Sequence, residues 1–285
     1  MANLTCGRYI LTLSAVRPLV MGILNVTPDS FSDGGQFAML DKALAHAQEM
    51  IHAGVDIIDV GGESTRPGAA LVSVKEELAR VLPIVKALRD CGKPLSIDTY
   101  KPEVMHACLA EGADMINDVN ALQAPGALEA VKQSHCAICL MHKQGSPQTM
   151  QMAPNYDDVV DEVRLFLIDR LHCLQTAGIS MGRIVLDPGF GFGKKLAHNL
   201  ALANTLLKTS VADLPWLVGV SRKAMLGQLT GHDVSQRVLP SIVAALALAQ
   251  QGASIVRVHD VAETIEAFKV WQALTGLPIN TANMN

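Results

Sequence analysis

The sequence predicts a single α/β domain that folds as a (β/α)8 TIM barrel with a short N-terminal cap segment. Eight short apolar runs alternate with longer stretches of helical spacing along the 285 residues. This alternation is typical of parallel strands joined by helical crossovers. Each run also ends at a polar or charged residue, and a barrel places such residues at its carboxyl-terminal rim. The endings are Asn25, Glu63, Asp98, Asn117, His142, Asp187, Lys223 and His259.

The eight runs are rich in β-branched residues and are bounded by Gly, Pro, Asp or Asn. This profile is typical of strands that are buried on both faces. In chain order the runs are Val20–Leu24, Val55–Val60, Leu95–Ile97, Met115–Ile116, Ala137–Met141, Ile184–Leu186, Trp216–Val220 and Ile255–Val258.

Apolar residues at helical spacing separate these runs. Residues 78–88 form one face of a helix, which Ser73 is placed to open as a capping box. Pro102 is placed in the first turn of the next helix. Further helices are expected at 238–249 and 261–271. A glycine that commonly ends a helix stands before several of the runs, at Gly54, Gly112, Gly178 and Gly252.

A doubly wound open sheet would give the same alternation of strands and helices. Eight evenly repeated units, in a chain close to the ~250 residues usual for a barrel, favour closure instead. We therefore expect one domain over residues 1–285. Within it, residues 1–16 form a cap or hairpin over the barrel floor, 17–276 form the barrel and 277–285 form a tail.

The composition excludes several classes of partner. A net charge of −4 with no basic cluster argues against nucleic acid as the main partner. No apolar stretch approaches the ~20 residues that span a bilayer, and the first residues lack the pattern of a secretory signal. We therefore expect a cytoplasmic protein without a membrane partner.

Six cysteines raise the question of a disulfide framework or a redox pair. Cys136 and Cys139 have Cys-x-x-Cys spacing, but they fall in an expected strand, where residues three apart point to opposite faces. No helix N-terminus is placed to lower a thiol pKa there, and no second pair has zinc-site spacing. Ordinary buried thiols are the favoured interpretation.

Four of the polar endings predict a pocket for a flat polar ligand. Asp98, Asn117, Asp187 and Lys223 end the third, fourth, sixth and seventh runs, so their side chains converge on the barrel interior. The carboxylates can accept from an amino group and a ring N–H, while the lysine donates to a carbonyl. The alternative is that both carboxylates are structural and pair with Lys223 or with backbone groups.

The eighth run predicts an anion site. Alternation along a strand places Arg257 and His259 on the same face, and Ser221-Arg222-Lys223 ends the neighbouring run. Phosphate sites in these barrels commonly form at this position. Asn25 would be adjacent after closure and could bind a hard cation together with phosphate oxygens. A lone asparagine is more often a turn residue.

Two long polar loops follow the first two runs, over residues 25–35 and 61–68. Their small residues and glycines suit mobile flaps over a site. They could also be ordinary solvated connections, although both exceed the usual ~4–6 residues.

The glycine-rich segment 187–194 matches neither common phosphate-binding loop, so we discard that interpretation. Its glycines more plausibly let Phe190 and Phe192 approach a ligand closely. Met141 is expected in the core or the pocket wall, and His142 could be either structural or ligand-binding.

These residues together resemble the dihydropteroate synthase family of the folate pathway. The resemblance rests on segments 22–35 and 61–68, followed in order by Ser96-Ile97-Asp98-Thr99, Ile116-Asn117-Asp118-Val119, Leu140-Met141-His142, Leu186-Asp187-Pro188-Gly189, Ser221-Arg222-Lys223 and Arg257-Val258-His259-Asp260. It covers nearly the whole chain. It implies a barrel enzyme that joins 4-aminobenzoate to 6-hydroxymethyl-7,8-dihydropterin diphosphate with Mg²⁺ as cofactor, without a covalent intermediate.

The resemblance also implies a role for each matching residue. The pterin would be bound by Asp98, Asn117, Met141, Asp187 and Lys223. The diphosphate would be bound by Asn25, Thr65, Arg66, Arg257 and His259, with Asn25 as the ligand of Mg²⁺. The 4-aminobenzoate pocket would be formed by Phe31, Ser64, Thr65, Arg66, Pro67, Phe192, Ser221 and Lys223. The catalytic residues would be Asp33, Arg66, Lys223 and Arg257, with Asp33 near the reacting carbon.

Two rival functions use a similar barrel. A pterin-binding methyltransferase module would keep Asp98, Asn117 and Asp187 but has no use for a diphosphate clamp. A non-catalytic pterin-binding protein would tolerate loss of the two loops, and both loops are present. The resemblance also implies a homodimer through the last helices and competition by sulfonamides at the 4-aminobenzoate pocket.

Overall fold

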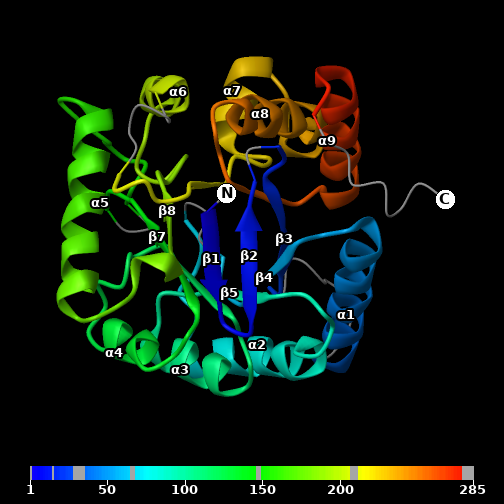
Figure 1. Cartoon of the computed structure of the whole chain (residues 1–285), viewed down its shortest axis with the longest axis vertical. Helices are drawn as coiled ribbons and strands as arrows, with labels where there is room; N and C mark the ends of the chain where they lie inside the picture. The colour runs from blue at the N-terminus through cyan, green and yellow to red at the C-terminus, as the bar shows by residue number, and fades with distance from the viewer. Residues whose placement is uncertain are drawn as a thin grey trace.

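A closed parallel barrel surrounded by helices confirms the expected fold (Figure 1). The structure is a computed structural model, and it describes residues 2–14, 16–27, 36–64, 68–145, 149–205 and 211–277, without the side chains of 36–38. Figure 1 shows the helices from α1 to α9 following one another in a ring around the strands.

The barrel strands follow the expected runs to within a few residues. They are β3 (Leu19–Asn25), β4 (Ile57–Gly61), β5 (Leu95–Asp98), β6 (Met115–Asp118), β7 (Ala137–Met141), β8 (Ile184–Asp187), β9 (Leu217–Val218) and β10 (Ile255–Val258). Strand β9 covers only Leu217–Val218 of the expected run Trp216–Val220, and the chain then turns at Arg222, whose φ is +57°.

Closure of the sheet decides between the barrel and the open sheet. Neighbouring strands pair in parallel from β8 through β3 to β10 and β9. A parallel bridge between Leu186 in β8 and Trp216, just before β9, then joins the two ends of the sheet. Leu186 N also donates to Pro215 O at 2.9 Å. The doubly wound alternative is therefore excluded.

Helices connect successive strands and cover the outside of the barrel. They are α1 (Gln36–Ala53), α2 (Val74–Leu88), α3 (Pro102–Ala110), α4 (Ala127–Lys132), α5 (Val159–Thr176), α6 (Leu196–Thr205), α7 (Ala224–Thr230), α8 (Val238–Gln250) and α9 (Val261–Thr275). Among the described residues, no helix is both long enough and apolar enough to cross a bilayer.

Local sequence signals set the ends of these helices. The Ser73 hydroxyl accepts from Glu76 N at 3.2 Å and caps α2, and Pro102 is the first residue of α3. The glycines expected to end helices, at positions 54, 112, 178 and 252, all have positive φ.

The first residues form a hairpin that packs against one end of the barrel. Strands β1 (Ala2–Cys6) and β2 (Tyr9–Leu13) pair antiparallel as a hairpin, which crosses the middle of the barrel in Figure 1. Apolar side chains of the hairpin join a cluster with the inward residues at the start of the strands. This floor cluster consists of Leu4, Cys6, Leu13, Met21, Ile57, Met115, Ala137, Cys139, Val185, Leu217 and Ile255.

Alternation along each strand then determines what lies above the floor. Two residues after Ile57, Asp59 has the same inward orientation, and two residues after Met115 so does Asn117. By the same rule Arg257 follows Ile255. The barrel interior is therefore apolar at its floor and charged toward the carboxyl ends of the strands.

Candidate active site

A polar cavity with a volume of about 820 Å³ lies at the carboxyl ends of the strands. It is lined by residues from six barrel strands, from the loops that follow the strands, including those after β4 and β9, and from α2. Most of the described residues that the resemblance assigns to the site are in the lining, namely Asn25, Ser64, Asp98, Asn117, Met141, Asp187, Phe192, Lys223, Arg257 and His259. A volume of this size is within the usual range for small-molecule sites.

Arg257 is the centre of a buried charged network in this cavity. Its Nε donates to Asp59 Oδ2 at 2.6 Å, and its Nη2 donates to Asp98 Oδ2 at 2.8 Å. Asn117 Nδ2 also donates to Asp59 Oδ2, at 3.2 Å. Burial alone would lower the pKa of Arg257, but the carboxylates of Asp59 and Asp98 raise it overall. Arg257 therefore remains a cation in the barrel interior.

Asp98 presents an acceptor to this cavity. Its Oδ1 atom is buried and has no hydrogen-bond partner among the described residues. Desolvation raises the pKa of Asp98 to about 7, with Asp59 adding to the shift and Arg257 opposing it. A buried carboxyl oxygen without a partner is costly unless a ligand satisfies it. The geometry therefore suits a ligand that offers N–H groups.

The Ser221–Lys223 turn aims Lys223 into the cavity. Arg222 has a left-handed backbone, which costs energy in a residue with a side chain. Asp260 holds its guanidinium, and Arg222 N donates to Ser241 Oγ at 2.8 Å. Lys223 Nζ donates to Phe190 O and lies 4.5 Å from the centre of the Phe192 ring. Burial lowers the pKa of Lys223 to about 8, although Asp187 opposes the shift.

Asp187 is held by the start of its own loop. Its Oδ1 accepts from Gly189 N at 2.7 Å. Desolvation raises the pKa of Asp187, while Lys223 and the Gly189 N–H lower it. Asp187 and Lys223 therefore form a complementary pair of groups at one side of the cavity.

His259 and Ser221 lie together at one corner of the site. The Ser221 hydroxyl lies 3.0 Å from His259 Nδ1 and accepts from His259 N at 3.2 Å. Ser221 does not line the cavity, whereas His259 does. Ser221 therefore contacts the site through His259.

The segment after β4 is anchored by a buried group of charges. Glu63 Oε1 accepts from Val72 N at 3.1 Å and from the Tyr100 hydroxyl at 3.3 Å. Its Oε2 accepts from Lys101, which also pairs with buried Glu77. Glu63 therefore joins the two ends of the segment from 63 to 72, and most of its described residues line the cavity. Glu63 is one of the eight polar strand endings, and these contacts give it a structural role that the sequence did not predict.

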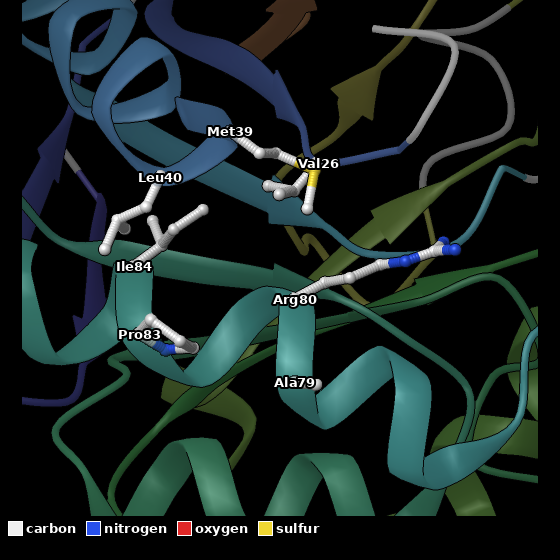
Figure 2. Close-up of a pocket in the computed structure, with 7 residues that line it drawn as sticks. All are labelled: Val26, Met39, Leu40, Ala79, Arg80, Pro83 and Ile84. Carbon is white, nitrogen blue, oxygen red and sulfur yellow. The ribbon is translucent and has the colours of Figure 1, made fainter. Parts of the chain in front are cut away.

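Arg80 supports the same loop from α2. Its Nη1 donates to Gly62 O at 2.7 Å, and it also pairs with Glu76. Arg80 borders both the polar cavity and a smaller apolar cavity of about 150 Å³ between α1 and α2. In Figure 2 its guanidinium points away from the apolar side chains of Leu40 and Ile84. Arg80 therefore supports the loop without filling the apolar cavity.

Asn25 is suited to a metal that a substrate also binds. The described residues contain no group of three or more His, Cys, Asp or Glu able to hold a metal by themselves. A Cβ on Gly61 would lie 3.5 Å from Asn25 Oδ1 and 3.6 Å from Asp98 Cβ, so glycine leaves room between these oxygen-bearing side chains. Mg²⁺ commonly uses one or two protein oxygens together with substrate phosphates. The residues present fit such an ion.

Some predicted site residues cannot be placed. Phe31 and Asp33 in the first loop, and Thr65, Arg66 and Pro67 in the second, lie outside the described residues. Their assigned roles stay predictions.

The cysteines behave as ordinary thiols. All six are free, and Cys136 and Cys139 are both buried. Burial raises the pKa of the Cys139 thiol well above its usual range, which opposes redox reactivity. The described structure therefore agrees with the favoured interpretation.

Sequence reasoning missed Asp59, which is fully buried and pairs with Arg257. Its signal is a carboxylate within the apolar run Ile57-Ile58-Asp59-Val60. A charge inside a buried strand predicts a partner across the barrel.

Comparison with known proteins agrees with this geometry. The family described as pterin binding enzyme matches residues 21–259. A dihydropteroate synthase of Escherichia coli strain K12 is 52% identical over 263 residues, which is 92% of this chain and 93% of the relative. Two solved structures cover nearly the whole chain. Burkholderia cenocepacia dihydropteroate synthase, complexed with 7,8-dihydropteroate, has a TM-score of 0.88 at 50% identity and covers 96% of this chain and 97% of its own. Xanthomonas albilineans dihydropteroate synthase, with 4-aminobenzoic acid, has a TM-score of 0.90 at 50% identity. This match covers 97% of this chain and 99% of the Xanthomonas chain.

Proposed function

The chain belongs to the dihydropteroate synthase family of pterin-binding enzymes, and from this membership we propose a role for each group in its site. The enzyme transfers an alkyl group: it joins 4-aminobenzoate to 6-hydroxymethyl-7,8-dihydropterin diphosphate and releases diphosphate. The observation that carries this function is 52% identity over 92% of the chain. Because relatives at about 50% identity are dihydropteroate synthases, a methyltransferase module is not favoured.

The pterin ring is bound by groups on the strands. Asp98 and Asp187 accept from the amino group and ring N–H groups, and Asn117 and Lys223 add amide and ammonium contacts. Met141 lies against the ring face. The unpartnered Oδ1 of Asp98 supports this role, because a buried acceptor gains most from a ligand that satisfies it.

Arg257 and His259 hold the diphosphate. The bonds of Arg257 to Asp59 and Asp98 use Nε and Nη2, and a guanidinium has five N–H donors, so others can serve phosphate oxygens. Ser221 orients the His259 ring through its contact with Nδ1. Arg257 and His259 together stabilise the negative charge that develops on the departing diphosphate.

Asn25 would hold Mg²⁺ together with oxygens of the diphosphate. The ion would supply positive charge there and neutralise negative charge on the leaving group. The cavity position of Asn25 and the room left by Gly61 support this proposal.

The reaction breaks the bond between the pterin methylene carbon and the diphosphate oxygen, and the electron pair leaves with the diphosphate. The amine nitrogen of 4-aminobenzoate then bonds to that carbon and loses a proton. Asp33 is proposed to support positive charge at the carbon, and Arg66 to cover the leaving group. No protein nucleophile is required.

The second substrate binds between Phe192, Lys223 and the loop after β4. Ser64 lines the cavity near this loop, and Phe31, Thr65, Arg66 and Pro67 are proposed to complete the pocket. The cation of Lys223 beside the Phe192 ring suits an aromatic carboxylate. Sulfonamides, which mimic 4-aminobenzoate, are expected to compete at this place.

A homodimer through the last helices is the proposed assembly. Exposed apolar side chains gather on α8 and α9, at Leu239, Val243, Val270 and Leu274. Such side chains favour burial against another surface. The cytoplasmic location stays a prediction from the sequence.

The proposed function is tested by incubating the protein with the pterin diphosphate, labelled 4-aminobenzoate and Mg²⁺. Labelled 7,8-dihydropteroate should form, and chelation of the Mg²⁺ should stop it. Folded protein that forms no labelled product would overturn the function. Product formation that survives chelation would remove the magnesium role alone.

A further inference from the structure

Lys194 is a buried lysine whose contacts the reaction above does not use. Its side chain is almost inaccessible, at 3% exposure, and among the described residues no carboxylate lies within ion-pair distance of its amine. Nζ lies 2.9 Å from His142 Nδ1 and donates to Gly189 O at 2.9 Å and Phe192 O at 3.1 Å. Burial lowers the pKa of Lys194 to about 7, with the charge of Asp187 opposing the shift, so the buried amine depends on such partners to replace water. The loop from 189 to 193 therefore supplies the acceptors that a counter-ion would otherwise provide.

The shape of this loop depends on close packing of backbone on backbone. Gly189 has a φ of +71°, and a Cβ there would lie 1.8 Å from His142 O. Gly193 has a φ of +63°, and a Cβ there would lie 2.4 Å from Gln144 O. Only glycine allows these approaches. The glycines of this motif thus serve to press the loop onto residues 142–144, where Lys194 joins the two segments.

His142 completes the cage around the amine. Burial, and then the charge of Lys194, lowers the pKa of His142 to about 3, so its ring stays neutral and offers a lone pair. Its ring also packs edge-on against Phe166, with ring centres 5.0 Å apart. His142 is therefore a fixed acceptor, which gives this strand ending a structural role.

The loop presents groups that face the second substrate. Phe190 O accepts from Lys223, and the Phe192 ring lies beside the same amine. Both contacts come from the loop that Lys194 holds. Asp98 and Asn117 instead project directly from barrel strands. A change at Lys194 should therefore disturb the Phe192 ring more than the strand residues that bind the pterin.

We propose that Lys194 is a positioning residue for 4-aminobenzoate, acting through Phe192 by fixing the loop from 189 to 193. This proposal rests on the proposed function. It assigns the glycine-rich segment to the placement of the aromatic substrate, and it predicts separate effects on the two substrates.

The test replaces Lys194 by methionine, which keeps the length and apolar stem but removes the donors. The K194M variant should raise the KM for 4-aminobenzoate by roughly tenfold or more, because a small misplacement of substrate-contacting groups is costly. Its affinity for the pterin diphosphate, measured by calorimetry with Mg²⁺, should change less than about threefold. The exposed neighbour Lys195 provides the matched control, and K195M should behave as wild type.

A double-mutant cycle separates positioning from general destabilisation. If Lys194 acts through Phe192, the effect of K194M on the KM should be smaller in an F192A background than in wild type. If K194M fails to fold by circular dichroism, K194Q retains an N–H donor and should show a weaker shift in the same direction.

The outcomes distinguish this proposal from the proposed function. Wild-type protein without product would overturn the function itself. Active wild-type protein with K194M equal to K195M, or with both substrates affected equally, would overturn the positioning role. Strict additivity with F192A would do the same.

Discussion

The two ends of the barrel interior are built from the same strands, yet they differ in polarity and in how they are covered. At the floor, Met115 and Ile255 pack with Leu4 of the hairpin, and the cluster is entirely apolar. Two residues further along the strands, Asn117 and Arg257 lie in a charged network with Asp59. The floor is covered by the hairpin, while the other end opens into the large cavity.

The difference shows how one fold separates stability from chemistry. Burial of apolar side chains stabilises the floor without requiring any ligand. The charged end instead contains a buried acceptor on Asp98 without a partner and cations with shifted pKa values. Perturbed groups of this kind concentrate where function requires them. Substitutions at the two ends should therefore have separable effects on folding and on catalysis.

The largest effect is expected at Arg257. The R257A variant should lower turnover by about 10²–10³-fold, because it removes a preformed cation from the diphosphate corner. It should also destabilise the fold by about 3–5 kcal/mol, because it leaves Asp59 and Asp98 without their partner. Steady-state kinetics and urea denaturation measure the two effects. R257K, which keeps the charge, should lose less stability, and unchanged turnover in R257A would remove Arg257 from the clamp.

At the floor, a substitution should affect stability alone. Leu4 is 1% exposed, and L4A should lower the free energy of unfolding by about 2–5 kcal/mol. Both KM values should remain as in wild type when measured well below the unfolding temperature. Ile10, which is 72% exposed on the same hairpin, gives the control I10A with little change. A large change in either KM in L4A would mean that the two ends are not independent.

A moderate effect is expected at Glu63, which anchors the loop after β4 to the barrel. E63Q removes the charge that Lys101 pairs with, while Glu77 still pairs with the same amine. The KM for 4-aminobenzoate should rise by roughly three- to tenfold, because a single anchoring interaction of the loop is worth about 1 kcal/mol. E111Q, in the surface pair of Glu111 with Lys86 at 3.2 Å, is the control. Equal KM values in E63Q and wild type would contradict the anchoring role.

A further effect concerns the pH dependence of stability. The pKa of Asp98 is raised from 3.8 to about 7, first by desolvation and then by Asp59. Its contribution to stability is therefore fully present below pH 3.8 and is lost as the pH rises toward 7. The free energy of unfolding of wild type, relative to D98N, should fall over this interval in urea denaturation. A difference that stays constant with pH would contradict a raised pKa.

The sequence predicted the barrel because its strands and helix ends are local signals. Apolar runs, Ser73 and Pro102 act within a few residues, and the structure confirms each of them. The inward orientation of Asp98 and Asn117 also follows from strand alternation. What local signals could not supply was pairing across the barrel.

Asp59 and Lys194 illustrate this limit. Asp59 pairs with Arg257, which is 198 residues away in the sequence. Lys194 depends on His142, 52 residues away, and on backbone carbonyls that the residue types do not reveal. The roles of Phe31, Asp33, Thr65, Arg66 and Pro67 stay predictions from the resemblance.

The most direct test of whether the two ends of the barrel interior act independently is the affinity for the pterin diphosphate. It is measured by calorimetry with Mg²⁺ in the D187N and L4A variants. D187N should lose at least about tenfold in affinity, because a hydrogen bond to a charged group contributes about 1.5–3 kcal/mol. L4A should bind as wild type does, although it is the less stable protein. Wild-type affinity in D187N, or weakened binding in folded L4A, would contradict the account.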